Sequence, residues 1–158
     1  MLTHHDLVAI VLAVIFGSAV GLEREMSGKA AGLRTNLLIC LGAAVFTVIS
    51  RQMAAEAADS LTRIAAQVVT GVGFLGAGAI IVDRGGIYGL TTAATIWLVA
   101  SIGTACGAHL YALAALVTFI ALLALLGLAQ LEIPLQRYGK KRKQRSQPDT
   151  PEQTNRQT

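Results

Sequence analysis

Charged residues are scarce in this sequence. Asp, Glu, Lys and Arg together make up 14% of its 158 residues, whereas soluble domains carry about 25%. Hydrophobic residues account for 54%, and the mean hydropathy is +0.60. A soluble fold of this length cannot bury so much apolar surface, so the composition excludes an ordinary soluble domain. We expect lipid to surround much of the chain.

Other kinds of residue are also missing. The only two cysteines, Cys40 and Cys106, lie within apolar segments, which excludes a disulfide framework and is typical of small buried hydrophobic residues. The N-terminus lacks the basic residues of a cleavable signal peptide, so the first apolar segment is expected to be retained. The basic run 140–145 contains no aromatic residue, which argues against binding of nucleic acid.

Five apolar segments follow one another along the chain. A helix needs about 20 apolar residues to cross a bilayer core of about 30 Å. The segments cover approximately residues 7–22, 33–49, 64–82, 87–106 and 110–131. The last two are separated near Gly107-Ala108-His109, because the uncharged stretch 85–131 is too long for one crossing. The prediction is an all-α membrane protein with five transmembrane helices.

The connections between these segments are polar. A tight loop is expected at 83–86, a short interfacial helix within the alanine-rich connection 50–63, and a turn at the membrane surface at His109. Residues 1–135 are predicted to form the membrane domain. Residues 136–158 are predicted to form a basic cytoplasmic tail, which its polar composition and two prolines predict to be disordered.

The distribution of basic residues predicts the orientation, because Lys and Arg concentrate in cytoplasmic loops. With five crossings, the N-terminus, the 50–63 connection and the 107–109 turn share one side, which carries two Lys or Arg residues. The other side carries eleven, seven of them in the tail. We therefore predict an N-out/C-in topology. The tail should also attract anionic lipid headgroups, by about 1 kcal/mol per basic residue.

Small residues recur at helical spacing in two of the segments. Ala66, Thr70, Gly73 and Ala77 form one stripe in segment 64–82, and the first segment has a similar face that includes Gly17 and Gly21. Small residues let membrane helices approach closely. Segment 64–82 is therefore predicted to be a central helix with others packed closely against it. The predicted packing glycines are Gly17, Gly21, Gly71, Gly73, Gly76 and Gly78.

The residues Gly71-x-Gly73-x-x-Gly76 also match the dinucleotide-binding pattern. That pattern requires a strand before it, a helix after it and an acidic residue about 20 positions further on. The nearest acid is Asp83, 12 residues after Gly71, and the neighbouring segments are membrane-length apolar runs. Helix packing is the preferred interpretation of these glycines.

Polar residues gather at the predicted cytoplasmic ends of the segments. Charged groups at membrane depth tend to pair or to mark function. Glu23 and Glu25 lie on different sides of a helix, so one of them is expected to face inward toward Arg34. The alternative is that these charges simply end the helices and anchor them at the interface. The candidate functional cluster consists of Glu23, Arg24, Glu25, Arg34, Thr35, Asn36, Gln67, Asp83, Thr91 and Thr92.

Within this cluster, Gln67 is notable because an amide in lipid requires a partner. Glu23 and Asp83 could together bind Mg²⁺, which takes one or two protein carboxylates. The sequence nevertheless shows no ligand set of a dedicated metal site and no nucleophile–base pair. No metal, no cofactor and no enzymatic activity are therefore expected.

Four stretches resemble the MgtC/SapB family of bacterial inner-membrane proteins, in order and spacing, over roughly residues 7–130. They are Gly21-Leu22-Glu23-Arg24-Glu25, Ala31-Gly32-Leu33-Arg34-Thr35, the run from Arg63 to Gly78, and Gly89-Leu90-Thr91-Thr92-Ala93-Ala94-Thr95-Ile96-Trp97. The resemblance implies a five-helix, multi-pass domain of the inner membrane that is linked to growth in low magnesium and, in some pathogens, to survival inside host cells.

The sequence also departs from that family. Many members carry a soluble ACT-like domain after the helices, whereas this sequence continues into the basic tail. Some virulence-associated members have Asn at the position of Thr91 and Cys at the position of Leu98. These departures weaken a transfer of the virulence role. The family has no ATPase motif, and this sequence contains neither a P-loop nor Asp-Lys-Thr-Gly.

The leading hypothesis is a non-enzymatic inner-membrane protein that supports magnesium homeostasis or stress adaptation. It would act through contacts with other membrane proteins, and self-association is compatible with its small-residue stripes. The alternative is a small oligomeric transporter or channel for Mg²⁺, with Glu23, Arg34 and Asp83 at its inner mouth. A third hypothesis is a scaffold held at anionic lipid by its tail.

Overall fold

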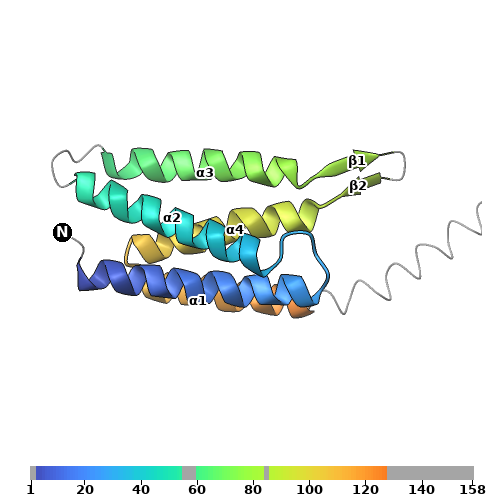
Figure 1. Cartoon of the computed structure of the whole chain (residues 1–158), viewed down its shortest axis with the longest axis horizontal. Coiled ribbons are helices and arrows are strands. Elements are labelled where there is room, and N and C mark those ends of the chain that lie inside the picture. The colour runs from blue at the N-terminus through green and yellow to red at the C-terminus, as the bar shows by residue number, and fades with distance from the viewer. Residues whose placement is uncertain (1–2, 55–59, 84–85, 128–158) are drawn as a thin grey trace, which may run out of the picture. The chain divides into compact units, whose positions relative to one another are not determined.

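The computed structural model describes residues 3–54, 60–83 and 86–127 of the chain. Its elements are α1 (His4–Met26), α2 (Leu33–Ala54), α3 (Ser60–Gly78), β1 (Ile81–Asp83), β2 (Gly86–Tyr88) and α4 (Leu90–Gly107), as Figure 1 shows. A further helix, Tyr111–Gly127, follows α4. A first compact unit extends to Leu122, and residues 123–127 are the described part of a second unit.

The described residues thus contain five helices, one for each predicted apolar segment. Of the helices in this part of the chain, α1, α2 and α4 are long and apolar enough to cross a membrane. Ala66–Gly78 and Tyr111–Gly127 are shorter apolar helices. The predicted helical architecture is confirmed, whereas five crossings and the N-out/C-in topology stay predictions.

The connection between α3 and α4 contradicts the all-α prediction. The third helix ends at Gly78 instead of Val82, and the fourth begins at Leu90 instead of Ile87. Between them β1 and β2 form an antiparallel hairpin in which Val82 pairs with Ile87 (Figure 1). β-branched residues favour extended backbone, and Gly89 begins α4 with a left-handed φ of 86° that favours glycine.

Glycines set the packing of α1 and α4 on α2. A Cβ at Gly17 would lie 2.6 Å from the Cβ of Cys40, and one at Gly21 would lie 2.8 Å from the Cα of Leu33. On the other side, a Cβ at Gly103 would collide with the carbonyl oxygen of Cys40. Because small residues permit such approaches, α2 lies between two closely packed neighbours.

The predicted central position of α3 is therefore wrong within the described chain: α2 takes that place. α3 contacts α2 and α4 through a face that includes Val72 and Val68. Its predicted packing stripe is exposed, and this stripe consists of Ala66, Thr70, Gly73 and Ala77. A Cβ at Gly71, Gly73 or Gly78 would meet no atom within 4 Å, and one at Gly76 would make only ordinary contact with Ala93.

Two predictions concern residues that lie wholly or largely outside the described ranges. The interfacial helix within 50–63 centres on residues 55–59, which lie outside the described ranges, and the flanking residues belong to α2 and α3. The basic tail 136–158 also lies outside them. The tight loop predicted at 83–86 coincides with the hairpin, where Asp83 pairs with Gly86.

Candidate functional site

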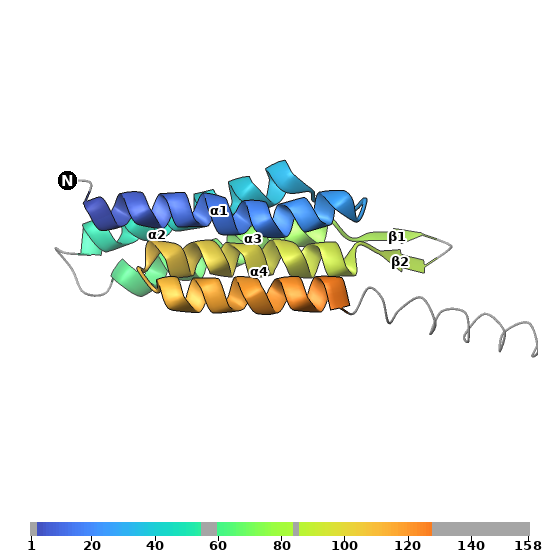
Figure 2. The ribbon, with the colours of Figure 1, turned by 90° about the horizontal axis from the view of Figure 1, so that it is seen from below.

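The alternating course of the helices brings the predicted polar residues, except Gln67, to one end of the helices. The end of α1, the start of α2, the β1–β2 hairpin and the start of α4 all lie at this end, which we call the hairpin end (Figures 1 and 2). The opposite end contains the start of α1, the end of α2 and the turn after α4. The two ends carry different polar clusters.

At the hairpin end, Glu23 and Arg24 form a buried ion pair. Their side chains are 7% and 4% exposed, and Arg24 Nε donates to Glu23 Oε2 while Arg24 Nη2 donates to Glu23 Oε1 at 2.7 Å. Ser27 Oγ also donates to Glu23 Oε1, at 2.8 Å. Glu23 is therefore the glutamate that faces inward. Its partner is Arg24 rather than the predicted Arg34, which is exposed.

Glu25 caps the following helix. The first backbone N–H groups of a helix have no partner within it, and Gly32, just before α2, has no side chain to supply one. Glu25 Oε2 accepts a hydrogen bond from the backbone N–H of Leu33 at 3.0 Å. A Cβ at Gly32 would collide with this carboxylate. The carboxylate also lies near the positive end of the α2 dipole, which is favourable.

Asn36 fastens the connection between α1 and α2 from within. Its side chain is fully buried, and Nδ2 donates to the carbonyl oxygens of Ala31 at 2.7 Å and Gly32 at 2.9 Å. Because two carbonyl acceptors bind Nδ2, the orientation of the amide is fixed. Oδ1 is buried and has no hydrogen-bond partner in the described part of the chain.

The other members of the predicted cluster do not converge on these residues. Arg34, Thr35, Gln67, Asp83 and Thr91 are exposed, whereas Thr92 is buried. Asp83 lies in the hairpin, and the Glu23 carboxylate is already bound by Arg24 and Ser27. Among the residues that the structure describes, no group of three or more His, Cys, Asp or Glu could hold a metal ion. The cluster is an arrangement of caps and pairs.

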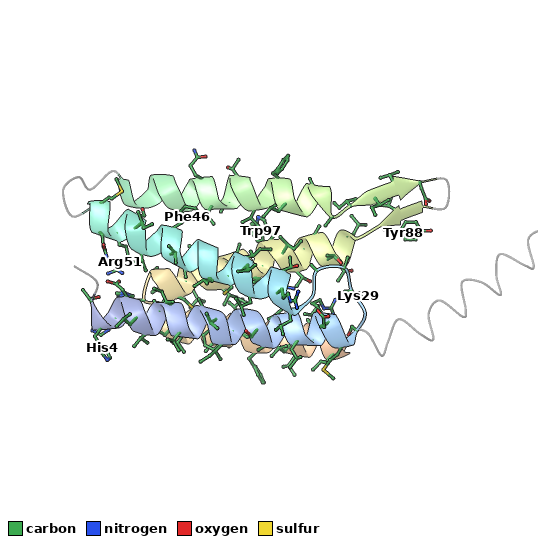
Figure 3. All side chains as sticks on the ribbon, viewed as in Figure 1. His4, Lys29, Phe46, Arg51, Tyr88 and Trp97 are labelled. Carbon is green, nitrogen blue, oxygen red and sulfur yellow. The ribbon has the colours of Figure 1, made fainter. Side chains whose placement is uncertain are left out.

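The opposite end carries a polar cluster that the sequence analysis did not select. Asp6 is 2% exposed, and its Oδ2 accepts hydrogen bonds from the backbone N and Oγ1 of Thr3 at 2.9 and 2.7 Å. Oδ1 lies 3.2 Å from Nη1 of Arg51 and 3.2 Å from Nε2 of His109. Gln52 Nε2 donates to Oδ2 at 3.3 Å. Figure 3 labels Arg51 and His4 at this end.

One local signal for this cluster was present in the sequence. Thr3-x-x-Asp6 ahead of an apolar run is a capping box, and both of its reciprocal hydrogen bonds form at the start of α1. Arg51, in the last turn of α2, and His109, in the turn after α4, are 45 and 103 residues away from Asp6. Only the fold shows that they meet there.

An apolar groove lies between α2 and α3. Its volume is about 570 Å³, and Gln67 is the one amide among its lining residues. Phe46, labelled in Figure 3, lines the α2 side. Gln67 lies near the middle of α3 and forms no hydrogen bond with the described part of the chain. The groove is otherwise apolar, lined by Ile39, Gly42, Ala43, Phe46, Ile49, Val68, Gly71, Val72 and Leu75.

Long apolar helices with buried charges at the ends of α1 define a helical membrane protein. The sequence model of the MgtC family matches residues 10–133, so the chain belongs to this family. It is 47% identical over 118 residues to YhiD of Escherichia coli K12, a match that covers 71% of this chain and 55% of YhiD.

Further relatives carry the name MgtC, and two of them illustrate the similarity. Protein MgtC of Brucella abortus is 44% identical over 114 residues, which cover 72% of this chain and 47% of that protein. Protein MgtC of Salmonella typhimurium is 40% identical over 147 residues, which cover 90% of this chain and 62% of that protein. The chain spans about half the length of the curated relatives it matches. No solved structure matches it.

Proposed function

We propose that this chain is a non-enzymatic, multi-pass protein of the bacterial inner membrane that supports magnesium homeostasis and adaptation to magnesium stress. It acts through helix contacts with other membrane proteins. Membership of the MgtC family and the provisional name of YhiD as a magnesium transporter support the link to magnesium. The proposed orientation is N-out/C-in, with the basic tail at anionic lipid on the cytoplasmic side.

The exposed face of α3 carries this proposal. Ala66, Thr70, Gly73 and Ala77 are all exposed, although small residues at this spacing are typical of closely packed membrane helices. Within the chain, the glycines at comparable interfaces meet a neighbour, as Gly17 and Gly103 do against α2. A small-residue face of this kind on α3 fits a transmembrane helix from another protein.

The test compares two glycine substitutions that the structure separates. Gly73→Leu adds a side chain where no atom lies within 4 Å, so the fold should tolerate it. Gly17→Leu adds one where a Cβ alone would lie 2.6 Å from Cys40, so the α1–α2 packing should fail. We expect Gly73→Leu to keep a normal protein level but to lose growth in low magnesium and co-purification of crosslinked membrane proteins.

A matched control places a leucine at an exposed position of α3 outside the stripe. Val69 is 51% exposed on α3, outside the stripe, so Val69→Leu should leave growth and co-purification intact. Equal growth of Gly73→Leu and Val69→Leu in low magnesium would contradict the proposal.

The alternative, a Mg²⁺ transporter or channel, rests on the name of YhiD. Purified protein in liposomes loaded with a magnesium-sensitive dye distinguishes the two. Flux down a Mg²⁺ gradient that an Asp83→Asn variant reduces would favour transport, and absence of flux would remove that alternative.

A further inference from the structure

His109 has one ring nitrogen in contact with two groups of opposite hydrogen-bonding character. Nε2 lies 2.8 Å from Nη1 of Arg51 and 3.2 Å from Oδ1 of Asp6. An arginine can only donate a hydrogen bond, and an ionised carboxylate can only accept one. Nε2 accepts from Arg51 when it carries no proton and donates to Asp6 when it carries one. It cannot do both.

A neutral ring with its proton on Nδ1 therefore fits Arg51, and a ring with a proton on Nε2 fits Asp6. With Nε2 unprotonated, Arg51 Nη1 donates to Nε2 and also lies 3.2 Å from Asp6 Oδ1 and 3.3 Å from the carbonyl oxygen of Gly107. When Nε2 takes up a proton, two cationic donors face each other at 2.8 Å. The proton then points to Asp6, and the Arg51 contact has to open.

We propose that Asp6, Arg51 and His109 form a proton-operated latch that joins the start of α1, the end of α2 and the turn after α4. Neutral His109 holds Arg51. Protonated His109 releases Arg51 and pairs with Asp6. This device does not depend on the proposed role in magnesium homeostasis.

The surroundings of the latch are suited to a switch. Asp6 is buried and its Oδ2 is held by Thr3 and Gln52, so the carboxylate stays in place while its Oδ1 exchanges donors. Arg51 and His109 are 32% and 23% exposed, so water can reach both. His109 has a φ of 63°, in a turn held by hydrogen bonds from its own N–H and that of Leu110 to the end of α4.

Other titratable side chains near the His109 ring come from α1 and from the helix that follows α4. From α1, the ring of His5 lies 5.6 Å from that of His109, and His4 lies next to His5. From the following helix, the ring of Tyr111 lies 5.7 Å away, and its hydroxyl donates to the carbonyl oxygen of His5 at 2.8 Å. Histidine is the side chain that ordinarily changes charge between pH 5 and 8. Protonation of His5 would add a second positive charge near Arg51 and would act in the same direction.

The first test determines which nitrogen of His109 carries the proton. The full chain, labelled with ¹⁵N-histidine, is placed in nanodiscs of phosphatidylethanolamine and phosphatidylglycerol and followed by NMR from pH 8 to pH 5. The three histidines are assigned with the variants His4→Asn, His5→Asn and His109→Asn. We expect neutral His109 to carry its proton on Nδ1 and to gain one on Nε2 as the pH falls. A neutral ring with the proton on Nε2 would overturn the proposal.

The second test measures the coupling between Arg51 and His109 as a function of pH. Asn tolerates positive φ and does not titrate, so His109→Asn keeps the turn and removes the switch. Tm is measured for wild type, Arg51→Gln, His109→Asn and the double variant. We expect the two Tm losses to be non-additive at pH 8, because each removes the same bond, and additive or reversed in sign at pH 5.

A structural role alone would give the same coupling at both pH values, and that result would overturn the latch. His4→Asn is the matched control, because His4 is exposed at the same end and has no contact with Asp6 or Arg51 among the described interactions. Its coupling to Arg51 should be absent at either pH, and a pH-dependent coupling there equal to that of His109 would also contradict the assignment.

Discussion

Removing one partner of the buried Glu23–Arg24 pair should destabilise the protein far more than removing an exposed charge nearby. Arg24→Met leaves the Glu23 carboxylate buried, with Ser27 as its remaining side-chain donor. Breaking a buried ion pair by removing one partner costs about 3–5 kcal/mol, because the other charge is left uncompensated. The native unfolding free energy of a domain is only about 5–15 kcal/mol. Arg24→Met should therefore bring the chain close to unfolding.

Two further variants test the reason for this loss. Arg34→Met removes an exposed arginine at the same end and should change stability by at most about 0.5 kcal/mol. The double variant Glu23→Gln/Arg24→Met removes both charges, and it should recover most of the loss because no uncompensated charge is buried.

Unfolding can be followed in detergent by titration with SDS. The chain has one tryptophan, Trp97, so its fluorescence reports on α4 while circular dichroism reports on total helix. If Arg24→Met is no more destabilising than Arg34→Met, or if the double variant is as unstable as Arg24→Met, the buried pair does not act as described.

Four other substitutions have outcomes that differ by position. Gly103→Ala should destabilise the protein because its Cβ collides with the α2 backbone, whereas Gly42→Ala meets no atom within 4 Å and should stabilise α2 by up to about 1 kcal/mol; SDS titration of both checks this, and equal effects would contradict the close approach. Glu25→Ala should lose about 1 kcal/mol through the uncapped N–H of Leu33, with faster amide exchange there as the readout. Gly89→Ala should lower Tm because φ is 86°, and an unchanged Tm would refute the strain argument.

Much of the fold could be predicted from the sequence. Alternation of long apolar segments with short polar connections determines that helices run up and down, so the connections after α1 and α3 must lie at the same end. This reasoning places Glu23, Asn36 and Asp83 at one end. In the structure, the end of α1, the start of α2 and β1, to which these residues belong, do lie at the same end (Figure 1). The composition likewise predicts that lipid surrounds much of the chain, because a soluble fold of 158 residues cannot bury the apolar surface of 54% hydrophobic residues.

A local apolar pattern predicts secondary structure less reliably where a helix and a strand are both compatible with it. The apolar run up to Val82 predicted a longer helix, because hydropathy does not distinguish a lipid-facing helix from a strand. In the structure, α3 ends at Gly78, and the last two residues of the run, Ile81 and Val82, lie in strand β1 of a hairpin. The difference lies in backbone conformation rather than in hydrophobicity.

The sequence by itself determined which residues are small enough for close packing and which are polar enough to need partners. It could not determine which of them are in contact, because a stripe of small residues permits close approach of a helix but does not specify which helix packs against it. Only the tertiary structure decided that Gly17 and Gly103 contact α2 while Gly73 is left exposed. Only the tertiary structure brought His109 to Asp6 across 103 residues. Periodicity acts within one helix, whereas these contacts depend on how separate helices are stacked.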